Sequence, residues 1–195
     1  MLKVGITGGI GAGKSVVCRV FETLGIPVFN ADDAAKKLME TDSALIAAIR
    51  GLFGDNIYTG HRLDRKKLAS IVFEQPVLLE KLNALVHPAT IAYGRKWMEE
   101  QDAPYTIKEA AIFFESGSDK EMDVMIGVSA PEELRIKRAM QRSGMTREKV
   151  LQRMASQMDD AEKMKRCDYI VTNDDVTALI PQVVDLHKKL IEKAR

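Results

Sequence analysis

The stretch Gly8-Gly9-Ile10-Gly11-Ala12-Gly13-Lys14-Ser15 decides how the rest of the chain is interpreted. It fits the pattern G-x-x-x-x-G-K-[ST] at all four fixed positions. In such a loop the glycines let backbone N–H groups curl around phosphate oxygens, and the helix that follows adds the positive end of its dipole. Lys14 can place its charge on the β and γ phosphates, and the Ser15 hydroxyl can bind Mg²⁺. The stretch therefore predicts a phosphate-binding loop.

The segments on both sides of this loop have the pattern expected for such a site. Residues 3–7 and 26–29 are short apolar runs typical of strands, and residues 14–24 carry apolar side chains at helical spacing before Gly25. Strand, turn, helix and strand within about 30 residues form a βαβ unit, which predicts a parallel sheet. A dinucleotide-binding G-x-G-x-x-G loop explains the stretch less well, because it does not require Gly13-Lys14-Ser15.

The remainder of the chain predicts a helical insertion in an α/β core. Residues 32–102 are expected to form helices without a strand, and His87-Pro88 is expected to break the longest apolar helix. Strands are expected at residues 106–114, 124–128 and 169–172, with helices beginning near Glu132 and covering residues 176–193.

We predict an α/β fold in which a parallel sheet of the P-loop NTPase type is flanked by helices and carries an inserted helical lobe and a helical lid. The expected parts are a nucleotide-binding core of residues 1–31, 103–134 and 160–195, an acceptor lobe of residues 32–102 and a lid of residues 135–159.

Composition excludes several classes of protein. The 195 residues include 29 Lys and Arg against 28 Asp and Glu, so the net charge of +1 argues against a nucleic-acid or polybasic membrane binder. No apolar run approaches the ~20 residues of a membrane span, and the opening residues leave no room for a signal peptide. Cys18 and Cys167 are too few for a disulfide scaffold. We expect a cytoplasmic protein with a small-molecule substrate and no nucleic-acid, membrane or obligate protein partner.

The fate of the nucleotide depends on residues outside the loop. No Asn-Lys-x-Asp tetrapeptide typical of a guanine-binding switch occurs. A motor ATPase needs a larger domain and an apolar strand ending in Asp, and the nearest match, residues 112–115, ends in Glu115. A small phosphotransferase fits better, because it needs only an acceptor site and a mobile cationic cover.

Both of these parts have candidates. Arg138 and Arg142 are four residues apart, so on a helix they share a face that could close over a transferring phosphoryl group, an effect of ~10³–10⁵ in rate. The alternative is a solvated basic helix face. Asp32 follows the second strand, where it could accept a proton from an acceptor hydroxyl or, alternatively, cap the next helix.

Several stretches together resemble the dephospho-coenzyme A kinase family, which uses ATP to phosphorylate the ribose 3′-hydroxyl of dephospho-coenzyme A. The resemblance begins at residues 7–15 and extends along essentially the whole chain. It includes Asn30-Ala31-Asp32 against the family's Asp-Ala-Asp, His87-Pro88, residues 111–115 against Pro-Leu-Leu-Phe-Glu, the lid residues Arg138, Arg142, Arg153 and Gln157, and residues 168–173 against Ala-Asp-x-Val-Ile-x-Asn.

The resemblance implies an ATP- and Mg²⁺-dependent kinase that performs the last step of coenzyme A biosynthesis. It implies catalytic roles for Asp32, Lys14, Arg138 and Arg142, and a metal ligand in Ser15. The implied nucleotide contacts are Gly9, Gly11, Ala12, Gly13, Lys14, Ser15, Val16 and Asn173, and the implied acceptor contacts are Asp32, Arg65, His87 and Glu115.

Some of these assignments have alternatives. Arg65 can equally be a solvated arginine, and His87 can serve only to break a helix. Asn30 replaces the family's first Asp, so it can still accept a hydrogen bond but brings no charge. Another small-molecule or nucleoside monophosphate kinase would share the loop and the lid, and a nucleotide sensor would share the loop without needing Asp32.

Overall fold

The chain divides into two units. In the computed structural model the backbone is described over residues 1–195, together with every side chain except those of Phe73 and Glu74. Met1–Asn30 and Glu100–Arg195 form the first unit, called here the core unit, and Ala31–Glu99 form the second, the helical unit. None of the helices among the described residues combines the length and the apolar character needed to span a membrane.

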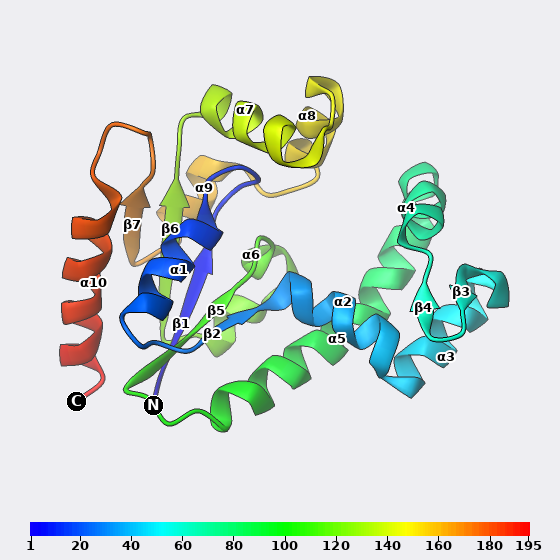
Figure 1. Cartoon of the computed structure of the whole chain (residues 1–195), viewed down its shortest axis with the longest axis horizontal. Helices are drawn as coiled ribbons and strands as arrows, with labels where there is room; N and C mark the ends of the chain where they lie inside the picture. The colour runs from blue at the N-terminus through cyan, green and yellow to red at the C-terminus, as the bar shows by residue number, and fades with distance from the viewer. The chain divides into compact units, whose positions relative to one another are not determined.

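Five parallel strands form the sheet of the core unit, in the order β2-β5-β1-β6-β7 (Figure 1). Because the strands are parallel, their carboxyl ends share one edge of the sheet, and the predicted phosphate loop begins there, directly after the central strand. The bounds are Leu2–Thr7 for β1, Val28–Asn30 for β2, Tyr105–Glu109 for β5, Val124–Ser129 for β6 and Tyr169–Thr172 for β7.

Helices cover this sheet. Phe21 of α1 and Leu190 of α10 belong to the same buried cluster as the apolar side chains of β1 and β6, so these two helices pack on the sheet. A smaller apolar cluster around Ile136 and Val150 joins α7 to α8. The helices are Lys14–Thr23 (α1), Phe113–Ser116 (α6), Ser118–Glu121 (η2), Glu132–Ser143 (α7), Arg147–Ala155 (α8), Asp160–Lys165 (α9) and Leu179–Lys193 (α10).

The helical unit has its own apolar core. Ile49 and Ile57 are fully buried in it, and Leu82 and Val86 contribute from the longest helix. Its elements are Ala31–Thr41 (α2), Ser43–Phe53 (α3), Asp55–Ile57 (η1), Tyr58–Thr59 (β3), Arg62–Leu63 (β4), Arg65–Glu74 (α4) and Pro76–Glu99 (α5).

Two expectations for this unit were wrong. The expectation of no strand missed the β3–β4 hairpin, whose two-residue strands are too short to show an alternating pattern. The expected break at His87-Pro88 does not occur, and α5 continues through Pro88. A proline leaves the carbonyl four residues earlier without its helical donor, and here both Ala84 and Pro88 are exposed, so water can reach that carbonyl.

Two boundaries in the core unit also differ from expectation. The strand expected at residues 106–114 ends at Glu109, and the apolar residues after it form a turn and α6, in which Phe113 is fully buried. The closing helix begins at Leu179 and not at residue 176, because Asp174 folds the preceding residues into a turn by accepting hydrogen bonds from the backbone N–H groups of Val176 and Thr177.

Candidate active site

The phosphate loop, residues 8–15, is fixed by its own backbone. The Ala12 N–H donates to the Gly9 carbonyl at 3.2 Å, and the Lys14 ammonium donates to the Gly8 carbonyl at 3.0 Å. Gly11 and Gly13 have φ angles of 77° and 93°, a region that favours glycine. Helix α1 begins at Lys14 with Gly13 as its N-cap, so the positive end of its dipole lies at the loop, where it favours an anion.

Neighbouring protein groups also require glycine in this loop. A Cβ at Gly9 would collide with the Arg135 guanidinium, and a Cβ at Gly11 would collide with the Arg135 carbonyl. A Cβ at Gly13 would collide with the side-chain amide of Asn173. The sequence pattern explained these glycines by the approach of phosphate, and the structure adds that two other segments of the core unit press against them.

Lys14 has a carboxylate neighbour that sequence reasoning missed. Glu109 ends β5, the strand beside β1, and one of its carboxylate oxygens lies 3.8 Å from the Lys14 ammonium. The residue is buried, with 5% of its surface exposed. Its signal was its place at the end of a strand, but extending that strand to residue 114 directed attention to Glu115 instead.

Asn30 supports this carboxylate. Its side-chain amide donates a hydrogen bond to the second carboxylate oxygen of Glu109, and Asn30 is paired with Glu109 in the register of β2 and β5. An ionised carboxylate at position 30 could not donate such a bond. Asn30 therefore places an amide donor, and not a second carboxylate, beside Glu109.

Glu115 is engaged by two groups of the core unit. Its carboxylate accepts a hydrogen bond from the Met158 N–H at 2.8 Å and pairs with the fully buried Lys163 at 2.9 Å. Burial alone would raise the pKa of Glu115, but the hydrogen bonds from Met158 and Lys163 outweigh it and hold that pKa below its usual value. Lys163 also donates to the carbonyl of Ala111 at 2.6 Å. These contacts tie α6 to the segment that follows α8.

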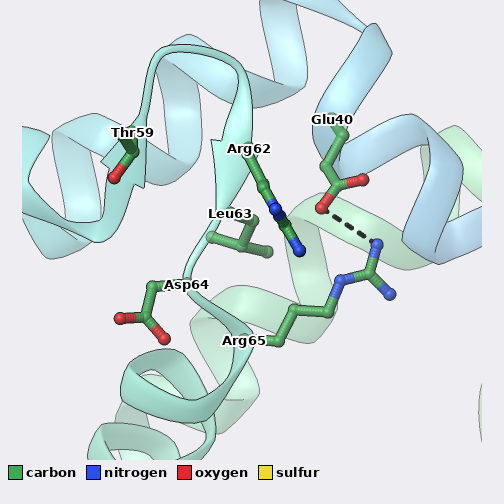
Figure 2. A pocket seen from close by; sticks show the side chains of 6 residues that line it. All are labelled: Glu40, Thr59, Arg62, Leu63, Asp64 and Arg65. Atoms are coloured by element: carbon green, nitrogen blue, oxygen red, sulfur yellow. Dashed lines mark ion pairs between the residues drawn. The ribbon is translucent and has the colours of Figure 1, made fainter.

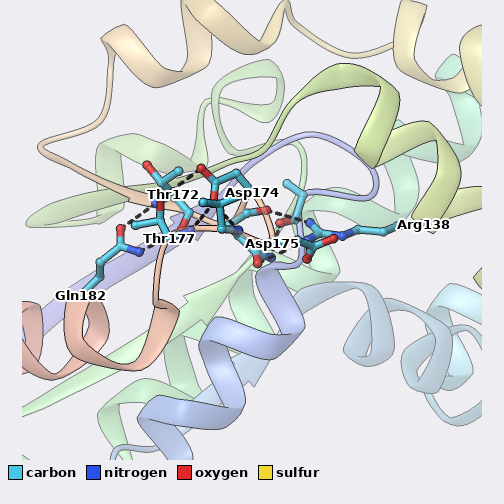
Figure 3. A network of polar contacts seen from close by, with 9 residues as sticks. Arg138, Thr172, Asp174, Asp175, Thr177 and Gln182 are labelled. Carbon is cyan, nitrogen blue, oxygen red and sulfur yellow. Dashed lines mark hydrogen bonds and ion pairs between the residues drawn. The ribbon is translucent and has the colours of Figure 1, made fainter.

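Asn173 and Arg138 lie beside the phosphate loop. The Asn173 side-chain amide donates to the Ala12 carbonyl at 2.8 Å, and Arg138 of α7 donates to the Asn173 carbonyl at 2.9 Å. Figure 3 shows Arg138 extending to the loop after β7, where it also pairs with Asp175. The same figure shows two further sets of hydrogen bonds that hold the loop after β7. Asp174 bonds Thr177, and Gln182 bonds the Thr172 backbone.

The other predicted contacts of the core unit are more exposed. Arg142 is exposed, and within the described residues it makes no hydrogen bond or ion pair. Ser15 and Val16 are also exposed, at the start of α1, whereas Ala12 is fully buried. Of the two predicted lid arginines, the structure therefore brings only Arg138 to the loop.

Three predicted residues belong to the helical unit. Asp32 lies in the first turn of α2, is exposed, and has no partner among the described residues. Because α2 already begins at Ala31, Asp32 is inside the helix and is not its N-cap. His87 is half-buried in α5, where burial lowers its pKa from the usual 6.5. Arg65 pairs with Glu40 at 3.1 Å.

Arg65 lines a pocket of about 530 Å³ (Figure 2). The side chains of Arg62 and Arg65 both extend towards Glu40 there. Arg65 is engaged by Glu40 and by the Lys36 carbonyl, but the Arg62 guanidinium makes no hydrogen bond or ion pair with the described residues. Arg62 was not singled out from the sequence, since a lone arginine in a two-residue strand carries no signal.

The donors for a metal ion are few. No cluster of three or more His, Cys, Asp or Glu that could hold a metal occurs among the described side chains. Mg²⁺ prefers oxygen ligands and is commonly held by one or two protein groups together with substrate phosphates. The Ser15 hydroxyl and the Glu109 carboxylate, which ends the strand beside the phosphate loop's strand, fit that donor set.

Comparison with known proteins gives a consistent result. A family model described as dephospho-CoA kinase matches residues 2–178. A dephospho-CoA kinase of Porphyromonas gingivalis is 40% identical over 196 residues, covering 100% of this chain and 95% of that protein. One of Bacteroides fragilis is 37% identical over 193 residues, covering 98% and 94% of the two chains.

Solved structures give the same picture of the fold. A dephospho-CoA kinase from Campylobacter jejuni superimposes with a TM-score of 0.73 at 28% identity, covering 99% of this chain and 98% of that chain. A gluconokinase from Sinorhizobium meliloti, 15% identical, matches with a TM-score of 0.51 over 99% of this chain and 93% of that chain, which shows likeness of fold alone. The predicted class, a P-loop parallel sheet flanked by helices, is confirmed.

The lowered pKa of His87 predicts a pH dependence of stability. Between the folded pKa of His87 and 6.5, the unfolded chain binds more protons at this residue than the folded chain does. The contribution of neutral His87 to the free energy of unfolding is therefore fully present above pH 6.5, and it is lost as the pH falls through the folded pKa. Urea unfolding should therefore show that His87→Gln loses less free energy of unfolding than the wild type between pH 7 and pH 5. His61→Gln, at an exposed position, is the control. A slope identical to that of the wild type in both variants would contradict this role of His87.

Proposed function

The chain belongs to the dephospho-CoA kinase family, and we propose on that basis that it transfers the γ-phosphoryl group of ATP to the ribose 3′-hydroxyl of dephospho-coenzyme A, giving coenzyme A. The observation that carries this proposal is the family match over residues 2–178, which includes the phosphate loop after the central strand. We also propose that the protein works in the cytoplasm, and its two free thiols, Cys18 and Cys167, are consistent with a reducing compartment.

In this proposal the phosphate loop holds the triphosphate. The N–H groups at the start of α1 bind phosphate oxygens, and Lys14 places its ammonium on the β and γ phosphates. Glu109 and the Gly8 carbonyl keep the Lys14 side chain directed along the loop. Asn173, which donates to the Ala12 carbonyl, and Arg138, which donates to the Asn173 carbonyl, form the side of the nucleotide site.

A bound Mg²⁺ would neutralise the charge of the phosphates during transfer. The chain's own contribution is a pair of oxygen groups, the exposed Ser15 hydroxyl and the Glu109 carboxylate. Asn30 holds that carboxylate through its amide and thereby keeps one of its oxygens beside Lys14. The lid residues Arg138 and Arg142 would then add positive charge near the transferred group.

The acceptor residues come from the helical unit. Asp32 follows β2 by two residues and is exposed, so it can accept the proton of the acceptor hydroxyl. Arg65 and Arg62, which line the pocket of Figure 2, are proposed to bind the diphosphate of dephospho-coenzyme A, for which arginine is well suited. His87 of the helical unit is also proposed to contact the acceptor. Glu115 is proposed to act indirectly, because its carboxylate already binds the Met158 N–H and the Lys163 ammonium.

The acceptor can be established by one panel. The wild-type protein is incubated with ATP and Mg²⁺ together with dephospho-coenzyme A, with adenosine monophosphate, or with no acceptor, and ADP release is followed. We expect release only with dephospho-coenzyme A, accompanied by an equal amount of coenzyme A. Release with adenosine monophosphate alone would assign a nucleoside monophosphate kinase, and no release with any acceptor would contradict an enzymatic function.

The role of Asp32 predicts a specific kinetic change. Asp32→Asn removes the proton acceptor and should lower kcat by ~10²–10⁴, with the KM for ATP nearly unchanged. Asp33→Asn is the matched control, because Asp33 is the neighbouring carboxylate in the same helical turn, is also exposed, and pairs with Lys36 at the surface. An unchanged kcat in Asp32→Asn, or an equal loss in both variants, would remove Asp32 from the base role.

A further inference from the structure

Both ends of the predicted lid, residues 135–159, meet at the phosphate loop. Arg135 lies at the start of this segment and Asp160 immediately after it, and the Arg135 guanidinium is 3.0 Å from the Asp160 carboxylate. The same carboxylate oxygen accepts a hydrogen bond from the Gly9 N–H, also at 3.0 Å. One oxygen atom therefore joins the first turns of α7, the start of α9 and the phosphate loop.

The contact is enclosed. Arg135 is 5% exposed, and the Asp160 side chain is 19% exposed. A Cβ at Gly9 would collide with the guanidinium and would lie 2.9 Å from the Asp160 oxygen, so position 9 admits only glycine in this arrangement. The next N–H of the loop, at Ile10, donates to the side-chain oxygen of Gln157 at 3.3 Å.

These hydrogen bonds involve the backbone N–H groups near the start of the phosphate loop. The Gly9 and Ile10 N–H groups both have side-chain acceptors within the protein, so the protein itself fixes the shape of this half of the loop. A hydrogen bond to a charged acceptor is about twice as strong as a neutral one. The Asp160 charge would repel a triphosphate, but Arg135 neutralises it at the point of contact.

We propose that Asp160 is a positioning residue for nucleotide binding: together with Arg135 it clasps the base of the lid onto Gly9 and preshapes the phosphate loop. The proposal rests on the proposed function only in taking the loop as the nucleotide site. Preshaping lowers the ordering cost of binding, so its loss weakens ground-state binding of ADP and ATP alike and leaves the chemical step nearly intact.

The test compares three variants. Asp160→Ala removes the contacts with both Arg135 and the Gly9 N–H, whereas Asp160→Asn keeps an oxygen for the Gly9 N–H but loses the charge that faces Arg135. The control is Asp159→Asn, which changes the neighbouring carboxylate of equal charge and keeps a good N-cap for α9. ADP affinity is measured by calorimetry, and the Gly9 amide is observed by NMR in the absence of nucleotide.

We expect Asp160→Ala to weaken ADP binding and to raise the KM for ATP about tenfold, with kcat within about twofold of the wild type. Asp160→Asn should show a smaller change, and Asp159→Asn none. The Gly9 amide proton should shift upfield in Asp160→Ala and stay near its wild-type position in Asp159→Asn.

Two outcomes would contradict the proposed role of Asp160. One is unchanged ADP affinity with an unchanged Gly9 signal in Asp160→Ala. The other is a fall in kcat alone, which would indicate loss of folded enzyme and not of loop shape. ADP binding and the Gly9 signal are read without any acceptor. A failure of the wild type to phosphorylate dephospho-coenzyme A would therefore contradict the proposed function alone. The ADP affinity and the Gly9 signal would still test the role of Asp160.

Discussion

The phosphate loop must be held in shape although half of its residues are glycines, which have no side chain with which to hold it. Its backbone has to present N–H groups to an anion, and bulky side chains would block that approach. The structure meets this constraint by supporting the loop from outside. Arg135 and Asp160 contact it at Gly9, and Asn173 holds it at Ala12. The placement of α7, α9 and the loop after β7 follows from this need.

The same constraint explains the charges at the sheet edge. Lys14 sits between the Gly8 carbonyl and Glu109, and Asn30 steadies Glu109 from the adjacent strand. A carboxylate this deeply buried is unfavourable unless its oxygens are paired or hydrogen-bonded. Because the partner at position 30 is a neutral donor, the carboxylate can stay charged beside the ammonium without a second negative charge next to it.

The local pattern was sufficient to predict most of the core unit. The glycine-rich stretch, the apolar runs beside it and the order of elements predicted a parallel sheet with the loop after its first strand, and the structure and the comparisons confirm this. Lys14, Asn173 and Arg138 were also identified in advance, and the structure brings all three to the loop.

What could not be predicted depends on long-range contacts. Glu109 and Asp160 carry no local motif, since their importance comes from strand pairing and from a bond that spans 151 positions in the chain. The break expected at Pro88 overlooked that a proline on an exposed helix face can leave its unpaired carbonyl to water. The roles of Asp32, Arg65 and His87 in the acceptor site remain predictions.

The most direct measurement of the central claim is a calorimetric titration of the wild-type protein with ADP and with AMP. A loop built to grip the outer phosphates should bind ADP at least ~100-fold more tightly than AMP, a difference of about 2.7 kcal/mol. Equal affinities for the two nucleotides would show that the loop does not recognise the outer phosphates, and would contradict the account.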